Sequence, residues 1–528
     1  EVHGVIDFYA LFYPEPVGHT VVHVCGDPVC AMAGADGMFK MLNRHAEVTN
    51  LSLSGVHQLT VERAPCLGLC EHAPAMLVKG AAAARALDLS VEDILMGKAR
   101  RPRSILGGSI QMLTANCGNG RPTTLAEYRA GGGYTALSKT LSLSPAQVIA
   151  EIKSAGLVGR GGAAFPAGRK MMTIAEDAPH PRYVVCNADE MEPGTFKDRM
   201  LLEGNPHLLI EGMILAAYAM QADMAYVFVR WAYKQPQQFL RRAIAEAYQA
   251  GYAGRDILGS GWSLELALHS SAGRYICGEE SALLNALEGG RAIPRQRPPF
   301  PPVVGLWGKP TVVNNVETLC NVPAIVAKGA EWYKGLSRSD DAGTKIYGVS
   351  GQVNRPGLWE LPMGTTVREI LEEHAGGMRP GFKFRGLLPG GASTDYLVEE
   401  HLDVPMDFGS VQAAGSRLGT GTMIVLDDRR CPVAMIHNLE RFFAHESCGW
   451  CTPCRDGLPW VTRLLEAVEL GRGRPEDLDL LEHHGRFLWV GFTYCALAPG
   501  AMEPLQGALK YFEEDFHRHL KERRCPWK

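Results

Sequence analysis

The order of apolar and polar residues predicts a small α/β unit at the start of the chain. Residues 20–24 and 75–78 are short β-branched or apolar runs, which are typical of buried strands. Residues 58–62 form another extended run. Over residues 30–45 the apolar side chains recur at helical spacing, so we expect a helix there.

The middle of the chain alternates helices with strands that end in polar residues. Residues 145–155 have the pattern of a helix, residues 183–186 that of a buried strand, and residues 281–287 that of a second helix. Residues 309–318 again pass from a strand to amides at the start of a helix. In open α/β sheets, ligands bind at the carboxyl ends of strands, so these polar residues are candidates for a site.

The pattern changes again in the last two hundred residues. Short strands at residues 345–349 and 423–425 flank a helix at residues 367–374, which predicts a small β-grasp-like module. From residue 434 onward the period is helical, which predicts a helical bundle. We find no internal repeat of fixed period.

Composition is that of an ordinary globular protein. The 528 residues predict three to four domains, and 53 Lys and Arg against 57 Asp and Glu leave a net charge of -4. This balance does not support a nucleic-acid partner. No apolar run is long enough to span a membrane and no signal peptide is evident, so we expect a cytoplasmic protein without direct membrane insertion.

Two closely spaced pairs of cysteines mark the N-terminal unit. Cys25 and Cys30 follow the first strand, and Cys66 and Cys70 follow the second extended run. Four thiolates suit either a 2Fe-2S cluster or a tetrahedral zinc ion. The spacing favours the cluster, because structural zinc usually takes Cys-x2-Cys pairs. The remaining alternative is a set of unliganded thiols in a thioredoxin-like core.

A second set of cysteines lies in the C-terminal helical region. Cys448, Cys451 and Cys454 follow a Cys-x2-Cys-x2-Cys pattern, and Cys495 is a distant fourth. Three thiols at this spacing can hold three corners of a 4Fe-4S cubane while the fourth closes it. A four-cysteine zinc site is the alternative. We assign no role to the other six cysteines, Cys117, Cys186, Cys277, Cys320, Cys431 and Cys525.

A glycine-rich loop between the two cysteine regions has the features of a phosphate cradle. Gly159, Gly161 and Gly162 would let backbone N–H groups approach a phosphate, and Arg160, Arg169 and Lys170 would supply positive charge. Isolated glycine loops are often turns without a ligand, so the loop alone is weak evidence.

Polar clusters downstream strengthen the prediction of a nucleotide site. They lie after the strand at 183–186, before the helix at 281–287 and after the strand near 312. Their members are Asn187, Asp189, Glu190, Glu192, Tyr275, Glu279, Glu280, Asn314, Asn315 and Thr318. Each cluster alone could be a helix cap with solvated charges. Their occurrence together in one domain favours a ligand.

Together, the glycine loop, the polar clusters and the second cysteine set resemble the family of NADH-binding flavin subunits of complex I, NAD-reducing hydrogenase and NAD-dependent formate dehydrogenase. The first hundred residues resemble the family's small thioredoxin-like 2Fe-2S subunit. The lead-in at residues 1–9 and the segment at residues 30–36 are most similar to formate dehydrogenase β-subunits. The resemblance thus implies a diaphorase subunit, with formate dehydrogenase first and hydrogenase or complex I as alternatives.

The resemblance also implies cofactors and their residues. Gly159, Gly161, Gly162 and Lys170 would hold FMN, and Asn187, Asp189, Glu190, Asn314, Asn315 and Thr318 would complete the flavin site. Phe165 would stack on NAD(H), Glu192 would lie near it, and Glu280 would face the adenine ribose, where its charge disfavours a 2′-phosphate. Tyr275 and Glu279 are further expected cofactor-binding residues. Hydride would pass directly between cofactors, so no catalytic side chain is expected.

The sequence departs from the family at three positions of the cradle. Ala164 stands where the family usually has Gly, Ala167 where it has Thr, and Met171 where it has an aromatic residue. An added methyl group in a loop that works by close backbone approach could shift the flavin.

The implied fold is a multidomain α/β protein. We expect a thioredoxin-like 2Fe-2S domain at 1–98, a linker or arm at 99–139, a Rossmann-like FMN and NADH domain at 140–335, a β-grasp module at 336–427 and a helical 4Fe-4S domain at 428–528. The implied partner is a catalytic α-subunit with a molybdenum or tungsten pterin and further iron-sulfur clusters, or else hydrogenase or complex I subunits. A zinc-stapled nucleotide-binding scaffold without redox activity is the alternative of a different class.

Overall fold

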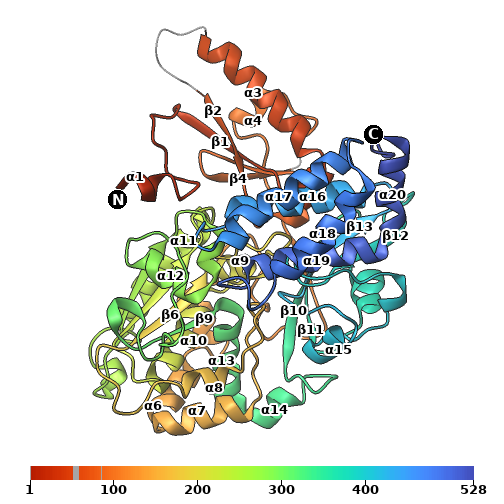
Figure 1. Ribbon diagram of the computed structural model, residues 1–528. Coiled ribbons are helices and arrows are strands. Elements are labelled where there is room, and N and C mark those ends of the chain that lie inside the picture. The colour runs from red at the N-terminus through yellow and green to blue at the C-terminus, as the bar shows by residue number, and fades with distance from the viewer. Residues whose placement is uncertain (1, 52–58, 85) are drawn as a thin grey trace.

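The computed structural model describes residues 2–51, 59–84 and 86–528, and its N-terminal domain lies at one end of a larger body (Figure 1). After a short helix α1 (Val2–Ile6), a four-stranded sheet has the order β2-β1-β3-β4. Its strands are β1 (Thr20–Cys25), β2 (Leu59–Ala64), β3 (Ala75–Val78) and β4 (Ala81–Ala84). β1 is parallel to β2 and antiparallel to β3.

The helix expected at residues 30–45 is present but divided. It consists of α2 (Pro28–Met32) and α3 (Ala35–Leu51), and Gly34 between them has a φ of +95°. This left-handed conformation ends one helix before the next begins. α4 (Val91–Leu95) completes the domain. The extended run expected at 58–62 is observed from Leu59, and residue 58 lies outside the described residues.

The central domain is built on a parallel sheet of order β8-β7-β6-β9. Its strands are β6 (Tyr183–Ala188), β7 (Met224–Val229), β8 (Glu265–Ser270) and β9 (Thr311–Asn315). Its helices are α7 (Pro145–Ser154), α8 (Ala167–Met171), α9 (Lys197–Gly204), α10 (Pro206–Ala219), α11 (Lys234–Gln249), α12 (Glu280–Leu287), α13 (Val316–Lys328) and α14 (Ala330–Lys334). Because β6 and β9 are parallel neighbours, their polar carboxyl ends lie at one edge of the sheet.

A mixed five-stranded sheet follows, with the order β12-β13-β10-β11-β5. Its strands are β5 (Ile105–Gly107), β10 (Thr344–Ser350), β11 (Gly357–Pro362), β12 (Phe384–Leu388) and β13 (Thr422–Asp427), and α15 (Phe408–Ala413) also belongs to this module. The helix expected at residues 367–374 is a wide π-helical turn, Glu369–His374.

Residues 99–139, which the sequence assigns to a linker or an arm over a partner, pack against their own chain. They contribute β5 to the mixed sheet, and then α5 (Leu125–Ala130) and α6 (Thr135–Leu141) to the central domain. The buried carboxylate of Glu360 in β11 accepts hydrogen bonds from the backbone of Leu113 at 2.9 Å and of Thr114 at 3.0 Å. Glu360 therefore fixes the segment between the two sheets.

The C-terminal region is helical, as predicted. It contains α16 (Pro432–Glu446), α17 (Thr452–Glu469), α18 (Pro475–Phe487), α19 (Leu497–Tyr511) and α20 (Glu513–Glu522). α16 and α17 form a hairpin, and α16 also packs against α2 and α19. Among residues 2–51, 59–84 and 86–528, no helix combines the length and apolar character needed to cross a membrane.

A buried arginine joins the N-terminal domain to the central one. Arg199 in α9 donates from Nε to the carbonyl of Gly68 at 2.8 Å and forms an ion pair with Glu71. Its guanidinium also lies 3.2 Å from the carboxylate of Glu203, which in turn accepts from Arg101 at 2.6 Å. The cysteine loop of the N-terminal domain is thus held against α9 by charges that have little access to water.

We predict that Arg199→Met loosens the N-terminal domain. The substitution leaves Glu71 buried without the Arg199 cation, which costs about 3 kcal/mol. The population of molecules in which the N-terminal domain has separated from α9 should therefore rise about 100-fold. Limited proteolysis should then release a fragment of about the N-terminal domain's size roughly 100-fold faster, because cleavage follows the open population. Arg129→Met, at an exposed arginine of α5, is the control. Equal cleavage rates in both variants would contradict the assignment.

Candidate functional site

The glycine-rich loop lies directly over the carboxyl end of β9. It is closed by a bridge between Val158 and Pro166 and by a hydrogen bond from the Gly159 amide to the Phe165 carbonyl at 2.9 Å. A Cβ on Gly161 would lie 3.0 Å from Cβ of Asn315, which is tighter than most Cβ contacts, so glycine favours this close approach. The loop is therefore pressed against the polar strand end.

Arg160 does not supply positive charge to a ligand, contrary to the sequence-based expectation. Its side chain is buried, and its guanidinium donates to the carbonyl of Ala342 at 2.6 Å and the hydroxyl of Tyr333 at 3.2 Å. Its backbone amide donates to Oγ1 of Thr318 at 2.8 Å. Arg160 and Thr318 thus position the loop, and the cations left to face a ligand are Arg169 and Lys170.

The predicted cofactor residues Lys170 and Glu280 meet across the site. Nζ of Lys170 lies 2.6 Å from Oε2 of Glu280, and Arg297 lies 3.3 Å from the other oxygen of the same carboxylate. Phe165 is 47% exposed at the loop tip, with the guanidinium of Arg169 6.0 Å from its ring centroid. An exposed aromatic ring beside partly exposed charges can stack a planar group and hold its polar substituents.

Two strand-end residues have buried polar atoms without a protein partner, as expected where a polar ligand binds. Asn314 has an unpaired side-chain nitrogen, and Asp189 has one unpaired carboxylate oxygen. The other oxygen of Asp189 accepts from the hydroxyl of Ser271 at 2.8 Å, and burial raises the pKa of Asp189 to about 6. Asn187 lies at the same edge, where its amide donates to the carbonyl of Gly278 at 3.1 Å. Such polar atoms suit a polar, ring-bearing cofactor such as FMN.

Several other predicted site residues are engaged in holding the protein together. Glu190 accepts hydrogen bonds from the amides of Asp198 and Arg199 at the start of α9 and from the hydroxyl of Tyr233. Glu279 caps α12, and Asn315 caps α13. In the structure these three side chains therefore bind backbone amides at the starts of helices, which is the alternative role that the sequence left open for them.

Glu192 and Tyr275 form a partly buried pair between the central domain and the β-grasp module. The hydroxyl of Tyr275 donates to Glu192 at 2.6 Å, and the amide of Ser393 donates to the other oxygen at 2.6 Å. Burial raises the pKa of Glu192. Their contacts fix the position of the loop that carries Glu279 and Glu280.

A buried network of four charges beneath the strand ends was not anticipated. Lys197 lies 2.7 Å from Asp198 and 2.9 Å from Glu317, and Lys345 lies 2.6 Å from Glu317. The two cations hold the pKa of Glu317 down at about 2 despite its burial. Asp198 also accepts from the side-chain amide of Asn315 at 2.6 Å. These charges come from separate segments, so sequence spacing gives no signal for them.

The structure brings the first cysteine set together. Cys25, Cys30, Cys66 and Cys70 are all buried free thiols, and the sulfurs of Cys66 and Cys70 lie 3.4 Å apart. The amide of Cys66 is held by Asp27, and the side-chain amide of Asn438 in α16 donates to the carbonyl of Gly26 at 2.8 Å. The cysteine loops therefore face the rest of the protein.

The second cysteine set surrounds the turn between α16 and α17. Cys448 and Cys454 are buried, and Cys451 and Cys495 are partly buried. Gly449 has a φ of +76°, which permits the tight turn. Burial raises the pKa of Cys454 and of Cys495 to about 12, so their thiolates need a compensating positive charge such as iron.

The second cysteine set directly adjoins the segment at residues 274–280, which we call the nucleotide loop. The buried carboxylate of Glu446 accepts from the amide of Tyr275 at 2.7 Å, and Arg274 donates to the carbonyl of Ser447 at 2.9 Å. Glu446 and Ser447 immediately precede Cys448. The segment that carries Glu280 is therefore hydrogen-bonded to the segment that carries the first cluster cysteine.

We predict opposite effects for glycine at two adjacent positions of the loop. Ala164 has a φ of +55°, so Ala164→Gly should relieve strain and stabilise the loop by about 0.5 kcal/mol after the entropy of glycine is counted. Exposed Ala163 is not among the positive-φ residues, and Ala163→Gly should destabilise the loop by about 0.5 kcal/mol. Hydrogen exchange over residues 159–166 measures both changes in the stability of the loop. Slower exchange in Ala163→Gly than in Ala164→Gly would refute this account.

Comparisons with known proteins agree with this geometry. The model of the Nuo51 FMN-binding domain matches residues 152–324, and that of the NADH-ubiquinone oxidoreductase-F iron-sulfur binding region matches residues 434–519. The thioredoxin-like [2Fe-2S] ferredoxin model matches residues 1–98, and the SLBB domain model matches residues 346–394. The predicted FMN, 2Fe-2S and 4Fe-4S modules are thereby confirmed, and the zinc-stapled scaffold without redox activity is not supported.

Individual relatives give the same result. A subunit of the NADH-quinone oxidoreductase of Salmonella typhimurium is 57% identical over 404 residues, which cover 76% of this chain and 91% of the relative. The corresponding subunit of Streptomyces coelicolor is 47% identical over 404 residues, which cover 76% of this chain and 90% of the relative. The crystal structure of an NAD+-reducing [NiFe]-hydrogenase in the air-oxidized state aligns with a TM-score of 0.85 at 33% identity, covering 99% of this chain and 88% of that chain.

The predicted family resemblance is therefore confirmed, together with the fold class and the oxidoreductase character that it implies. By its site, its domains and its relatives, this chain belongs to the family of NADH-binding flavin subunits that is represented in the NADH-quinone oxidoreductases.

Proposed function

We propose that this chain is the diaphorase subunit of a multi-subunit, NAD-linked oxidoreductase that exchanges electrons between NAD(H) and iron-sulfur clusters. The observation that carries the proposal is the pair of hydrogen bonds from Arg274 and Tyr275 to the turn before Cys448. They hold the nucleotide loop beside the cluster cysteines. Bound FMN supplies the chemistry between the two, because flavin exchanges a hydride with nicotinamide and single electrons with clusters.

The side chains serve to bind and orient. Asn187, Asp189 and Asn314 offer polar atoms at the strand ends, and the glycine loop offers its backbone amides. Phe165 offers an exposed ring for stacking. Lys170 and Glu280 offer a paired cation and carboxylate to the hydroxyl and phosphate groups of a dinucleotide. No side chain needs to act as an acid or base, because hydride passes between cofactors.

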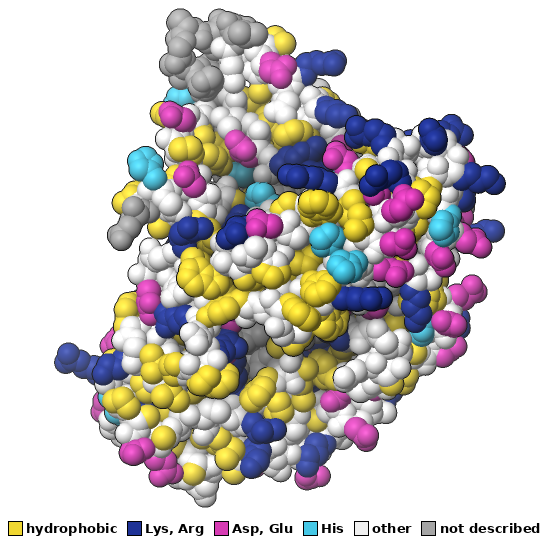
Figure 2. Space-filling view, viewed as in Figure 1, with side chains coloured by type: hydrophobic (Ala, Val, Ile, Leu, Met, Phe, Trp, Pro, Cys, Tyr) yellow, Lys and Arg dark blue, Asp and Glu magenta, His cyan; other side chains and the backbone are white. Residues whose placement is uncertain are grey.

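An exposed apolar surface next to the second cysteine set is the proposed docking site for the electron-transfer partner. Figure 2 shows hydrophobic side chains gathered over the C-terminal helices on this face. The exposed members near the cysteine turn and before Cys495 are Trp450, Trp460, Phe487, Val490, Phe492 and Tyr494. Aromatic clusters of this kind are enriched at protein interfaces. A partner cluster docked here would lie close to the 4Fe-4S site.

For the identity of the complex, we propose an NAD-dependent formate dehydrogenase as the finer assignment, on the lead-in at residues 1–9 and the segment at residues 30–36. The relatives bear the names of NADH-quinone oxidoreductase and NAD+-reducing hydrogenase, which favour the two alternatives. The 2Fe-2S module fused to the flavin module aligns along 99% of this chain with the hydrogenase chain, which makes hydrogenase the stronger alternative. Metal analysis of the purified native complex separates the three: molybdenum or tungsten supports formate dehydrogenase, nickel supports hydrogenase, and neither supports complex I.

We predict that Glu280→Gln increases the use of NADPH relative to NADH. The carboxylate repels a 2′-phosphate and neutralises Lys170, so its removal frees that cation for the phosphate, whereas Arg297 stays paired with Glu279. The ratio of kcat/KM for NADPH to that for NADH should rise about 10-fold, which corresponds to about 1.4 kcal/mol. Steady-state dye reduction measures the ratio, and Glu331→Gln, at an exposed glutamate of α14, is the control. An unchanged ratio would remove Glu280 from the specificity site.

We also predict that Cys454→Ala separates hydride transfer from electron exit. The variant should lose about four irons per chain and the spectroscopic signal of the 4Fe-4S cluster. NADH should still bleach the flavin absorption, because the nucleotide site does not include Cys454. Cys320→Ala, at a buried cysteine of α13, should retain both properties. A wild-type chain without flavin or iron-sulfur absorption under anaerobic conditions would overturn the proposed function itself.

A further inference from the structure

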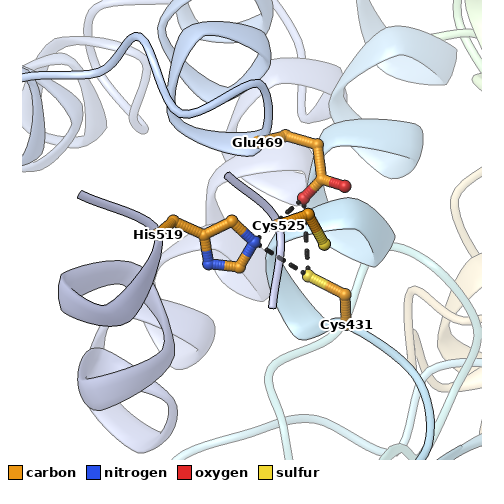
Figure 3. A group of neighbouring side chains, drawn as sticks. All are labelled: Cys431, Glu469, His519 and Cys525. Atoms are coloured by element: carbon orange, nitrogen blue, oxygen red, sulfur yellow. Dashed lines mark hydrogen bonds and ion pairs between the residues drawn. The ribbon is translucent and has the colours of Figure 1, made fainter. Parts of the chain in front are cut away.

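Four buried side chains from distant parts of the C-terminal region converge on one point (Figure 3). They are Cys431, Glu469, His519 and Cys525, and their ligand atoms all lie within 4.8 Å of one another. Cys431 precedes α16, Glu469 ends α17, His519 lies in α20, and Cys525 lies in the tail after it. None of them belongs to the nucleotide site or to the two iron-sulfur cysteine sets.

The imidazole of His519 is oriented as a metal ligand would be. Its Nδ1 lies 2.6 Å from the carbonyl oxygen of Asp515, and a carbonyl can only accept, so Nδ1 carries the proton. Nε2 therefore faces Sγ of Cys431 at 3.3 Å and Oε2 of Glu469 at 3.2 Å. A backbone hydrogen bond to the distal nitrogen is the usual way in which proteins fix a metal-bound histidine.

The sulfur and carboxylate atoms complete the group. Sγ of Cys431 lies 3.4 Å from Oε2 of Glu469, and the thiol of Cys525 is also buried. Trp527 stacks on the His519 ring at 5.9 Å and limits access from the tail side. Nζ of Lys528 lies 2.8 Å from Oε1 of Glu469, the oxygen on the side of the carboxylate away from His519 and Cys431.

We propose that these four residues bind a structural zinc ion. Two thiolates, one imidazole and one carboxylate are donors that zinc accepts, whereas calcium and magnesium require oxygen ligands. Two thiolates and a carboxylate carry three negative charges, which Zn²⁺ and the ammonium of Lys528 balance. All four positions of a tetrahedron are supplied by the protein, as in structural zinc sites rather than catalytic ones.

The position of the site indicates its role. α16 and α17 form a hairpin whose one end carries Cys448, Cys451 and Cys454, and whose other end carries Cys431 and Glu469. At 1.5 Å per residue, the 18 residues of α17 separate the two ends by about 27 Å. Zinc has no redox chemistry, so the ion would clamp α20 and the tail to the hairpin rather than carry electrons.

Metal analysis of the full-length chain tests the proposal. The purified protein should contain about one zinc ion in addition to about six irons from its two clusters. Cys525→Ala should lose the zinc while keeping the iron and the flavin, because the site is one helix length from the cluster. Cys320→Ala, which removes another buried cysteine outside the group, should keep both metals. A wild-type chain without zinc, or zinc retained in Cys525→Ala, would overturn the proposal.

X-ray absorption at the zinc edge gives a second test that does not depend on how a variant folds. In the wild-type chain we expect two sulfur ligands at about 2.3 Å and two nitrogen or oxygen ligands at about 2.0 Å. Four sulfur ligands would place the zinc in an iron-sulfur cysteine set instead and would refute the proposed site. A disulfide between Cys431 and Cys525 in peptide mapping of the native chain would refute it as well.

Discussion

The carboxylate of Glu446 joins the two parts of the protein on which electron transfer depends. It is fully buried, accepts from the amide of Tyr275 and lies two residues before Cys448. Burial raises the pKa of Glu446, but hydrogen bonding to His445 and the charge of Arg274 outweigh this effect and lower it. Glu446 is thus held as an anion between the nucleotide loop and the cluster turn. Any shift of α16 relative to that loop would leave its charge without these partners, which is costly.

The nucleotide side of this junction is supported from below. Lys197, Asp198, Glu317 and Lys345 bring α9, α13 and β10 together under the ends of β6 and β9. A network of this kind contributes little net stability compared with apolar packing. Removal of one partner is nevertheless strongly destabilising, because it leaves a buried charge unpaired. Its effect is to fix where the strand ends lie, and therefore where Asn314 and the glycine loop meet.

Patterns within short segments predicted the modules that the family models match, and they also gave the eight cysteines that we propose as cluster ligands. Strand and helix periods are local, and thiols spaced as Cys448, Cys451 and Cys454 can be recognised within a few residues. The roles of Arg160 and Glu190 could not be predicted in this way. Arg160 lies in a glycine loop but turns inward to Ala342, and Glu190 lies in an acidic run but caps α9. The direction in which each of these side chains points is decided by partners that are far away in the sequence.

The same limit explains why Cys431 and Cys525 had no assigned role. They are 94 residues apart and are separated from Glu469 and His519 by whole helices, so no short motif joins them. Only the α16–α17 hairpin and the return of α20 bring them together. The hairpin is therefore constrained at both ends, by the cluster cysteines near the nucleotide loop and by the four-residue group at the tail. A helix pair held at both ends cannot rotate freely about either. Rotation would displace Glu446 from Tyr275, so the distal group contributes to keeping the cluster beside the nucleotide site.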